Sequence, residues 1–278
     1  MDAALFDEMY RLETTHWWFT ARRAILLRLL RRYLPPAAER RIVDLGCGTG
    51  AFLDALASLG DAVGVDSAPE AVAYSARRGV SVRPGALPDH LPLSPDSADL
   101  VTLLDVLEHL EDDAAGLRAA ARLLRPGGLL LCTVPAFEWL WSGHDTLHAH
   151  RRRYTRAGLR ALLVDAGLAP VRVSYFNTWL LPAIAGVRLL RGGRRAAPRS
   201  DAQPVAAPYN ALLRAVFASE GWLLPRCDLP IGVSLVALAT RPPIAQHEQA
   251  ERHAEGQREP DVAAVEEDGG DAVQEDEE

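Results

Sequence analysis

A glycine-rich turn is the part of this sequence best suited to hold a small charged ligand. Asp44 is followed by Gly46, Gly48 and Gly50 in the run Asp-Leu-Gly-Cys-Gly-Thr-Gly, directly after a short apolar segment. Glycine lets the backbone turn sharply and lets a ligand approach where a Cβ atom would collide. Asp66 ends a second apolar segment 16 residues later, where a carboxylate can accept hydrogen bonds from both hydroxyls of a ribose. The pattern therefore indicates a site for a ligand that contains adenosine.

Two cofactors fit these residues. Gly46, Gly48 and Ala51 match the relaxed dinucleotide fingerprint, so a nicotinamide cofactor is one alternative. S-adenosylmethionine (SAM) is favoured, because Asp44 lies two residues before the first glycine. A carboxylate there can face a cationic amino-acid group but would repel a pyrophosphate. A degenerate turn that binds neither cofactor is the third alternative.

Histidines follow two of the expected strands and are candidates for acid–base work. Near neutral pH a histidine can take the proton of a hydroxyl that attacks a methyl group. His109 follows the fourth apolar segment and is either a base or acceptor-orienting group, or a helix-start histidine bonded to backbone. The segment 141–154, after the fifth strand, holds His144, Asp145 and His150. We take these four residues as the candidate catalytic groups.

The segment 141–154 has other interpretations as well. Arg152 and Arg153 either hold an anionic acceptor in a bidentate manner or anchor the loop together with Tyr154. His144 and His148 have metal-ligand spacing on a helix. Because no cysteine or second carboxylate lies near them in the sequence, we expect no metal site.

Three consecutive aromatic residues follow His16, at positions 17–19. They cannot all face one side of a helix, so at least one of them covers something else. Trp18 and its neighbours form either a lid over the cofactor or an apolar acceptor pocket, with Arg22 near the cofactor carboxylate, or a hydrophobic staple of the helix.

A second apolar region comprises residues 179–190 and 222–224, with Pro182 and Arg188 interrupting it. It falls short of the roughly 20 residues that a membrane span needs. It indicates either a wall for a lipid-like acceptor, with peripheral contact to a membrane surface, or a segment that simply packs on the core.

The elements that must position these residues alternate along the chain. One helix is predicted to begin after a capping box at Ser67 and to end at Gly79. Alternating strands and helices predict a Rossmann-like α/β fold, a doubly wound and mostly parallel sheet with an antiparallel terminal strand and helices on both faces. Right-handed crossovers then place the first two strand ends side by side, where such sheets bind ligands. The other expected strands are 41–45, 62–65, 100–104, 129–134 and a closing antiparallel pair at 171–175 and 233–240; the other expected helices are 20–34, 50–58, 113–124 and 155–166.

Charge and cysteine content bound the class of protein. All 30 basic residues are arginine, and residues 242–278 carry 13 acidic residues against two arginines, a net charge of −11 that leaves +4 for residues 1–241. This body is too weakly basic for a dedicated nucleic-acid binder, and the acidic tail has too few large apolar side chains to fold. Three scattered cysteines and an acidic N-terminal start without a signal peptide favour a cytoplasmic protein, with peripheral membrane contact as the alternative.

The ordered motifs resemble those of class I SAM-dependent methyltransferases. The matching segments occur in the family's order over about residues 38–240 and are Ile42–Gly50, Gly64–Asp66, Asp105–Leu110 and Leu123–Gly128. The His-Trp-Trp-Phe-x-x-Arg-Arg segment at the N-terminus and the His-Asp…His-x-Arg-Arg-Tyr segment at 144–154 resemble a subgroup of that family.

This resemblance implies roles for individual residues. Asp44, Gly46 and Gly48 would border the methionine part of SAM, and Asp66 would bind the ribose. The chain departs from the family at Gly85-Ala86-Leu87, where relatives usually carry Gly-Asp-Ala, which puts the adenine contacts in doubt. The remaining residues expected at the cofactor are Cys47, Gly50, Ser67, Ala86, Leu87, Asp105, Val106, Trp18 and Arg22.

The resemblance also implies an organisation and a reaction. Residues 1–37 would form an N-terminal helical lid, 38–240 the methyltransferase domain with substrate-side insertions at 136–156 and 176–230, and 241–278 a disordered acidic tail. The expected reaction transfers a methyl group from SAM to a small-molecule or lipid-like acceptor, with oxygen as the favoured atom. A non-catalytic SAM-binding partner protein and an NAD-dependent oxidoreductase are the alternatives.

Overall fold

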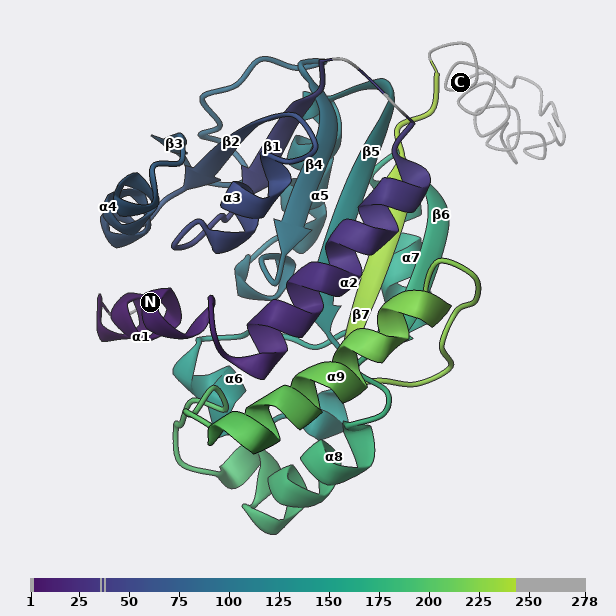
Figure 1. Cartoon of the computed structure of the whole chain (residues 1–278). Coiled ribbons are helices and arrows are strands. Elements are labelled where there is room, and N and C mark those ends of the chain that lie inside the picture. The colour runs from purple at the N-terminus through teal and green to yellow at the C-terminus, as the bar shows by residue number, and fades with distance from the viewer. Residues whose placement is uncertain (1–2, 36, 38, 244–278) are drawn as a thin grey trace, which may run out of the picture. The chain divides into compact units, whose positions relative to one another are not determined.

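A seven-stranded sheet organises the chain. The computed structural model describes residues 3–35, 37 and 39–243. Within them the strands follow the spatial order β3-β2-β1-β4-β5-β7-β6 (Figure 1). The strands are β1 (Arg41–Leu45), β2 (Asp61–Asp66), β3 (Val82–Pro84), β4 (Ala98–Leu104), β5 (Leu124–Pro135), β6 (Ala169–Phe176) and β7 (Ser234–Thr240).

The pairing of the strands confirms the expected mostly parallel sheet. Strands β3, β2, β1, β4 and β5 are all parallel to their neighbours. Strand β7 runs antiparallel to both β5 and β6, and it therefore lies between them. The expected antiparallel pair is thus confirmed.

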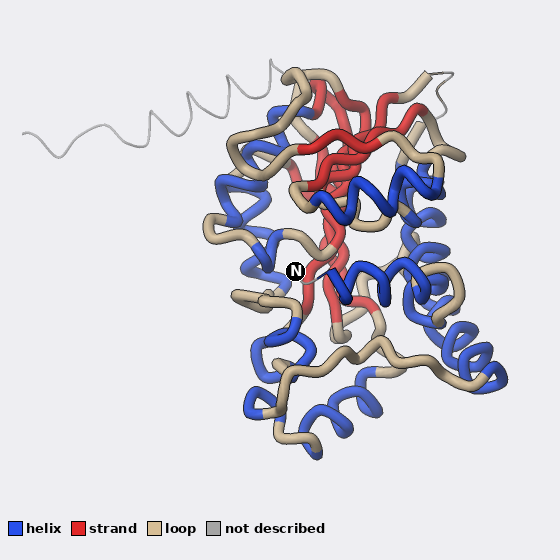
Figure 2. The backbone as a smooth tube through the Cα atoms, turned by 90° about the vertical axis from the view of Figure 1, so that its left-hand side faces the viewer, coloured by secondary structure: helices blue, strands red, loops and turns tan. Residues whose placement is uncertain are grey.

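Helices flank the sheet on both faces, as Figure 2 shows in a view turned by 90° from Figure 1. The first two helices form an N-terminal pair that precedes the first strand, and the remaining helices connect consecutive strands. The helices are α1 (Ala3–Leu12), α2 (Trp17–Tyr33), α3 (Ala51–Leu56), α4 (Pro69–Arg78), α5 (Asp113–Leu123), α6 (Gly143–Leu147), α7 (Arg156–Asp165), α8 (Leu181–Leu190) and α9 (Ala207–Leu223), with 3₁₀ turns η1 (Leu107–His109), η2 (Glu138–Leu140) and η3 (Gly193–Arg195).

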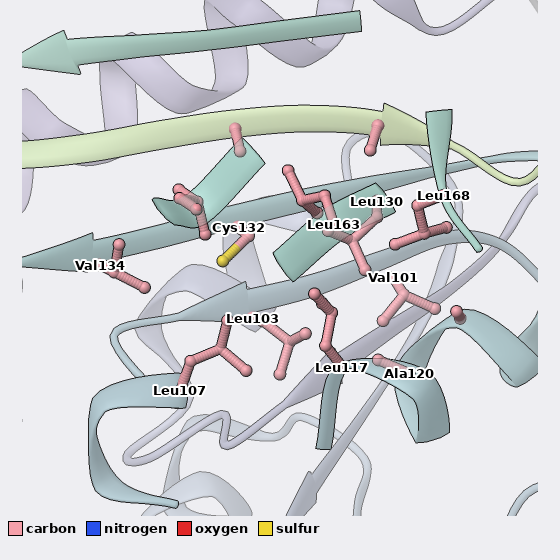
Figure 3. Packing of buried hydrophobic residues seen from close by; sticks show 14 of the residues in the cluster. Val101, Leu103, Leu107, Leu117, Ala120, Leu130, Cys132, Val134, Leu163 and Leu168 are labelled. Carbon is pink, nitrogen blue, oxygen red and sulfur yellow. The ribbon is translucent and has the colours of Figure 1, made fainter. Parts of the chain in front are cut away.

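Alternate residues of the central strands enter two separate cores. Successive side chains of a strand point to opposite faces, so Leu103 packs with α5 and α7 while Leu100 packs with α2 and α9. Figure 3 shows the first of these cores, in which Leu117 of α5 and Leu163 of α7 lie against strands β4 and β5. Both faces of β4 and β5 are therefore buried, and packing on the two faces positions these strands.

Two details differ from the sequence-based prediction. The capping box at Ser67 is wrong: Ala68 is the N-cap of α4, and Ser67 is exposed. The carboxylate of Asp66 accepts the hydrogen bond from the Ala68 N–H at 2.9 Å instead. Between β6 and β7, where no convincing helix was expected, the chain forms α8 and α9.

Two further predictions concern membranes and the tail. No helix in the described part of the chain is both long and apolar enough to span a membrane. The acidic tail falls almost wholly outside the described residues, so its disorder stays a prediction.

Candidate cofactor and acceptor site

The glycine turn after β1 has the backbone conformation that its sequence predicts. Gly46, Gly48 and Gly50 all have positive φ angles, of 69°, 56° and 86°. At Gly46 the surroundings matter too, because a Cβ atom there would lie 2.5 Å from Cγ2 of Val106. The turn after β1 therefore packs directly on Val106, two residues after the end of β4, and the expected contact of Val106 with the cofactor stays a prediction.

Asp66 ties two loops together at the carboxyl ends of β1 and β2. One carboxylate oxygen accepts from the Gly48 N–H at 2.9 Å, and the other accepts from the Ala68 N–H at 2.9 Å. The carbonyl of Asp66 accepts from the Gly85 N–H at 3.0 Å. The segment Gly85-Ala86-Leu87 thus begins beside Asp66, on the side where an adenine ring would follow a bound ribose.

Asp44 lies beneath the turn and is almost fully buried. The hydroxyl of Thr102 on β4 donates a hydrogen bond to it. Burial raises the pKa of Asp44 to about 7, although the Thr102 hydrogen bond and the nearby Arg22 charge act in the opposite direction. The group is therefore poised between its neutral and charged forms near neutral pH, and a cation placed beside it would favour the charged form.

Cys47 has a packing role in this structure. Burial raises the pKa of its thiol, and the negative charges of Asp44 and Asp66 raise it further. A Cβ atom on Gly64 of β2 would lie 2.6 Å from its sulfur. The side chain therefore fills the space between the turn and β2 as an uncharged thiol.

Helix α2 reaches the ends of β4 and β5 through Arg22, and the expected contact of Arg22 with the cofactor carboxylate stays a prediction. Its guanidinium lies 2.7 Å from Asp105 and donates to the hydroxyl of Thr133 at 2.6 Å. The ring of Trp18 lies 4.9 Å from the same guanidinium. Arg22 therefore reaches the ends of β4 and β5 as half of an ion pair. Trp17, by contrast, packs edge-to-face on Phe217 of α9 and serves the core.

Helix α1 covers the glycine turn through contacts that the sequence analysis missed. Buried Glu13 accepts a hydrogen bond from the Thr49 hydroxyl and pairs with Arg78 of α4. Met9 lies close to Gly48, since its Cε would be 3.0 Å from a Cβ atom there. These residues are far apart in sequence, and no local pattern joins them.

The loop after β5 contacts the segment after β4 through two hydrogen bonds from Arg151. The backbone N–H of Arg151 donates to the Glu108 carbonyl at 2.8 Å, and the side-chain Nε of Arg151 donates to the His109 carbonyl at 3.2 Å. The rings of His109 and His150 consequently lie 4.8 Å apart and nearly perpendicular. Burial lowers the pKa of His109 to about 4, with the proximity of His150 as a second cause. His109 is therefore a neutral imidazole near pH 7.

His150 is oriented by a buried carboxylate. Its Nδ1 lies 2.9 Å from Asp145, and Arg153 donates to both oxygens of the same carboxylate at 2.8 and 2.9 Å. Burial alone would raise the pKa of Asp145, but the His150 hydrogen bond and the Arg153 charge outweigh it and hold the pKa well below its ordinary value. With Nδ1 engaged, the free nitrogen of His150 is Nε2.

The arginines of this loop are occupied by the protein itself. The Arg153 side chain is 2% exposed and also donates to the Ala136 carbonyl. Arg152 pairs with Asp113, and the Tyr154 hydroxyl donates to the same carboxylate at 2.8 Å. This geometry supports the anchoring alternative over an anion-binding role for the two arginines.

His144 is directed away from the His109–His150 pair. Its Nδ1 accepts from the Asp201 N–H at 3.2 Å, and its ring lies 4.2 Å from that of His148 and 5.9 Å from that of His150. Of the four candidate catalytic residues, the structure thus brings His109, Asp145 and His150 into one connected group and leaves His144 at its margin.

Glu108 is the site residue that the sequence analysis overlooked. It is fully buried, and neither carboxylate oxygen has a hydrogen-bond partner among the described residues. Burial raises its pKa well above the ordinary value, and the neighbouring Asp105 raises it further. The available signal was its position directly before His109, four residues after the end of an apolar strand.

Comparison with known proteins agrees with this geometry. The sequence pattern of a family described as a methyltransferase domain matches residues 17–173, more than half of the 278 residues. The chain belongs to this methyltransferase family. The match begins at Trp17, so the family pattern includes helix α2 together with strands β1 to β5, whereas β7 lies outside it.

Curated relatives of this methyltransferase include a probable S-adenosylmethionine-dependent methyltransferase of Mycobacterium tuberculosis, 33% identical over 165 residues that make up 58% of each protein. A ubiquinone biosynthesis O-methyltransferase of Xanthomonas euvesicatoria is 41% identical over 104 residues, 35% of this chain and 44% of that protein. The chain thus matches less than two thirds of the length of these relatives. Their similarity supports SAM as the cofactor and removes the nicotinamide alternative.

Solved structures show the same fold at low sequence identity. One is a complex of a methyltransferase activator with a methyltransferase from Haloferax volcanii, with a TM-score of 0.55, 22% identity, and coverage of 86% of this chain and 94% of that chain. Another, a methyltransferase from Bacillus halodurans, gives a TM-score of 0.52, 18% identity, and coverage of 78% and 98%. The Rossmann-like methyltransferase fold is therefore confirmed.

Proposed function

We propose that this methyltransferase transfers the methyl group of SAM to an oxygen atom of a small-molecule acceptor. The observation that carries the proposal is the pair His109–His150, in which His109 ends the 3₁₀ turn that follows Val106 and His150 lies in the loop after β5. A methyl donor bound over the glycine turn would present its reactive carbon toward this edge of the sheet.

The cofactor half of the site supplies complementary charge. SAM carries a cationic sulfonium and a cationic amino group, and the residues at the turn are Asp44 and Asp66, with Asp105 at the end of the next strand. Asp66 would exchange its backbone hydrogen bonds at Gly48 and Ala68 in part for the ribose hydroxyls. Arg22 would provide a counter-charge for the cofactor carboxylate.

The acceptor half supplies a proton-accepting group. In the reaction an oxygen lone pair forms the new C–O bond while the C–S bond breaks and its electron pair stays on sulfur, and the acceptor proton must leave. His109 is neutral at pH 7 because burial lowers its pKa to about 4. His150 is held in one orientation by Asp145. Both can therefore receive or relay that proton, which favours oxygen over acceptors that need no base.

An apolar surface on α8 and α9 supports a lipid-like acceptor. Leu190 is 90% exposed, and Trp179, Leu212 and Trp222 are also exposed. Arg191, directly after α8, is exposed, whereas the Arg188 side chain is 11% exposed and pairs with Asp201. Exposed apolar side chains beside a cation suit the surface of an anionic membrane. We therefore include peripheral membrane contact in the proposal. Its test compares the binding of the unchanged chain and of Leu190→Ser to anionic vesicles.

The proposal is tested with SAM that carries a deuterated methyl group. The full chain is incubated with panels of phenols, quinols, carboxylic acids, amines and thiols, and products are identified by their mass increase together with S-adenosylhomocysteine formation. Methylated phenols or quinols that disappear in His109→Gln support the proposal. Tight S-adenosylhomocysteine binding without turnover on any panel would favour a non-catalytic SAM-binding protein, and transfer only to nitrogen or sulfur would contradict oxygen as the target.

A further inference from the structure

Glu108 is a buried carboxylate without a hydrogen-bond or ion-pair partner among the described residues. Its side chain is 0% exposed, and both carboxylate oxygens lack a hydrogen-bond partner in the described part of the chain. The charges of Arg22 and Arg153 favour the ionised form of Glu108, but each of these arginines forms its ion pair with another carboxylate. Buried charges in proteins are paired or coordinate a metal ion. Glu108 therefore either holds a proton or faces a cation that the protein alone does not supply.

Two histidines next to Glu108 complete a set of metal-binding atoms. One ligand atom each from Glu108, His109 and His150 can be chosen so that all three lie within 4.8 Å of one another. Bonds of about 2.0–2.2 Å to one ion would place such atoms roughly 3–3.5 Å apart. Small side-chain rotations would close the set. Two imidazoles and one carboxylate are ligands that divalent first-row transition metals accept, with positions left open for a further oxygen.

The surroundings of His150 fit a metal ligand. Its Nδ1 is engaged by Asp145, so Nε2 is the nitrogen available to an ion. Asp145 is itself fixed by Arg153 and by the Ser142 N–H at 2.8 Å. A carboxylate bonded to the second nitrogen of a histidine is the arrangement that orients metal-bound histidines and selects their tautomer.

We propose that Glu108, His109 and His150 bind one divalent transition-metal ion of the Zn²⁺ or Mn²⁺ kind. This differs from the metal alternative considered in the sequence, which was His144 with His148. In the structure His144 bonds to the Asp201 N–H and lies at the margin of the group, whereas Glu108 is brought in by the 3₁₀ turn η1 after β4.

The role of the ion, unlike its binding, rests on the proposed methyl transfer. The turn η1 follows Asp105 and Val106 directly, so the ion would stand beside the cofactor edge. An acceptor hydroxyl bound to the ion has a lowered pKa. Its proton passes to a water molecule, its oxygen forms the C–O bond, and the electron pair of the broken C–S bond stays on sulfur. With the ion bound, His109 and His150 serve as its ligands, and water takes the proton-accepting role that the metal-free site would give to them.

The test measures metal binding without SAM or acceptor. The full chain is stripped of metal with a chelator and titrated with Zn²⁺ and with Mn²⁺ in a calorimeter. We expect one ion per chain, and an affinity lowered at least about 100-fold in Glu108→Gln and in His150→Ala, since each removes one of three ligands. His90→Ala, a change of an exposed histidine on another loop, is the matched control and keeps the affinity of the unchanged chain.

Thermal unfolding provides the second readout. An ion that binds the folded state raises Tm, so Zn²⁺ should raise the Tm of the unchanged chain and of His90→Ala but not that of Glu108→Gln. Glutamine has the shape of glutamate and removes only the buried charge, so this variant should fold at least as well as the unchanged chain.

Three results would overturn the proposal: no binding of either ion, equal affinity in Glu108→Gln and the unchanged chain, or loss of binding in His144→Ala or His148→Ala but not in His150→Ala. Because no methyl donor is present, these results are independent of whether the chain transfers methyl groups to oxygen.

Discussion

The guanidinium of Arg22 lies 2.7 Å from the carboxylate of Asp105, so the second helix of the chain is tied to the end of the fourth strand. The same guanidinium donates to Thr133 on β5. This one side chain therefore fixes the N-terminal helices over the edge of the sheet at which the cofactor is expected.

Replacing Arg22 with Gln should weaken SAM binding about tenfold, which corresponds to 1.4 kcal/mol. The change leaves Asp105 without its cation and frees the start of α2 from β4 and β5. Calorimetric titration with S-adenosylhomocysteine measures the effect. Arg11→Gln is the control, because Arg11 pairs with Asp7 on the surface with its side chain 74% exposed, and exposed pairs contribute little. Equal losses in the two variants would contradict this prediction.

SAM binding should release a proton from Asp44 under mildly acidic conditions. Burial raises the pKa of Asp44 to about 7 in the ligand-free protein, and the cationic amino group of SAM would lower it again. Between about pH 5 and 7 the apparent affinity should therefore fall about tenfold for each unit of decreasing pH. Titrations at pH 6 in two buffers with different ionisation enthalpies give the number of protons released. Asp44→Asn should release none, and a pH-independent affinity of the unchanged chain would be inconsistent with this role.

The same shift affects the stability of the ligand-free protein. The folded-state pKa of Asp44 lies above its ordinary value of 3.8, so the folded state binds more protons than the unfolded state between pH 3.8 and about 7. The contribution of Asp44 to stability is then largest at low pH and decreases as the pH rises through this window. Urea unfolding of the unchanged chain and Asp44→Asn across the window isolates this contribution.

Gly46→Ala should abolish cofactor binding, whereas Gly79→Ala should not affect it. Both positions have positive φ angles, 69° and 77°, so each substitution costs about 1–2 kcal/mol of backbone strain. At Gly46 the new Cβ would also lie 2.5 Å from Val106, while at Gly79 it would meet nothing within 4 Å. Unfolding midpoints and S-adenosylhomocysteine titrations separate strain from contact. If Gly46→Ala bound S-adenosylhomocysteine with the affinity of the unchanged chain, the glycine turn would not be part of the cofactor site.

Asp145→Asn should destabilise the fold by about 3 kcal/mol. The substitution leaves Arg153 buried without its counter-charge, and removing one partner of a buried ion pair is costly. Because the Asp145 pKa lies below 3.8 in the folded state, this contribution is complete above that pH and decreases as the pH falls further. Denaturant unfolding measures it, with the exposed Glu138→Gln as the control. A loss below 1 kcal/mol would mean that Arg153 finds another partner.

Local patterns in the sequence were sufficient for the conformation of the glycine turn and for six of the seven described strands, whereas no range was predicted for β3 (Val82–Pro84). Apolar segments, glycines with positive φ, and Asp66 at a strand end are set by residues close together in the chain. The cap predicted at Ser67 is wrong because α4 begins one residue later than expected, with Ala68 as its N-cap, and Asp66 accepts from the Ala68 N–H. Helix α8 was not predicted because apolar residues cover most of its circumference, so its sequence has no amphipathic period.

Contacts between distant segments account for what the sequence could not indicate. Glu13 meets Thr49 and Arg78 across three elements, and no spacing rule links such positions. Glu108 was visible in the motif, but only the fold shows that its carboxylate is buried beside His150 without a partner.

The position of β7 between β5 and β6 sets an order of assembly. During synthesis, β5 leaves the ribosome about 100 residues before their shared neighbour β7, and β6 leaves it about 60 residues before β7. Until Ser234–Thr240 arrives, β5 is paired only with β4, and β6 has no neighbouring strand in the described sheet. Nascent chains of this protein should therefore stay protease-sensitive and dependent on chaperones until this last strand is released, which is late for a domain of this size.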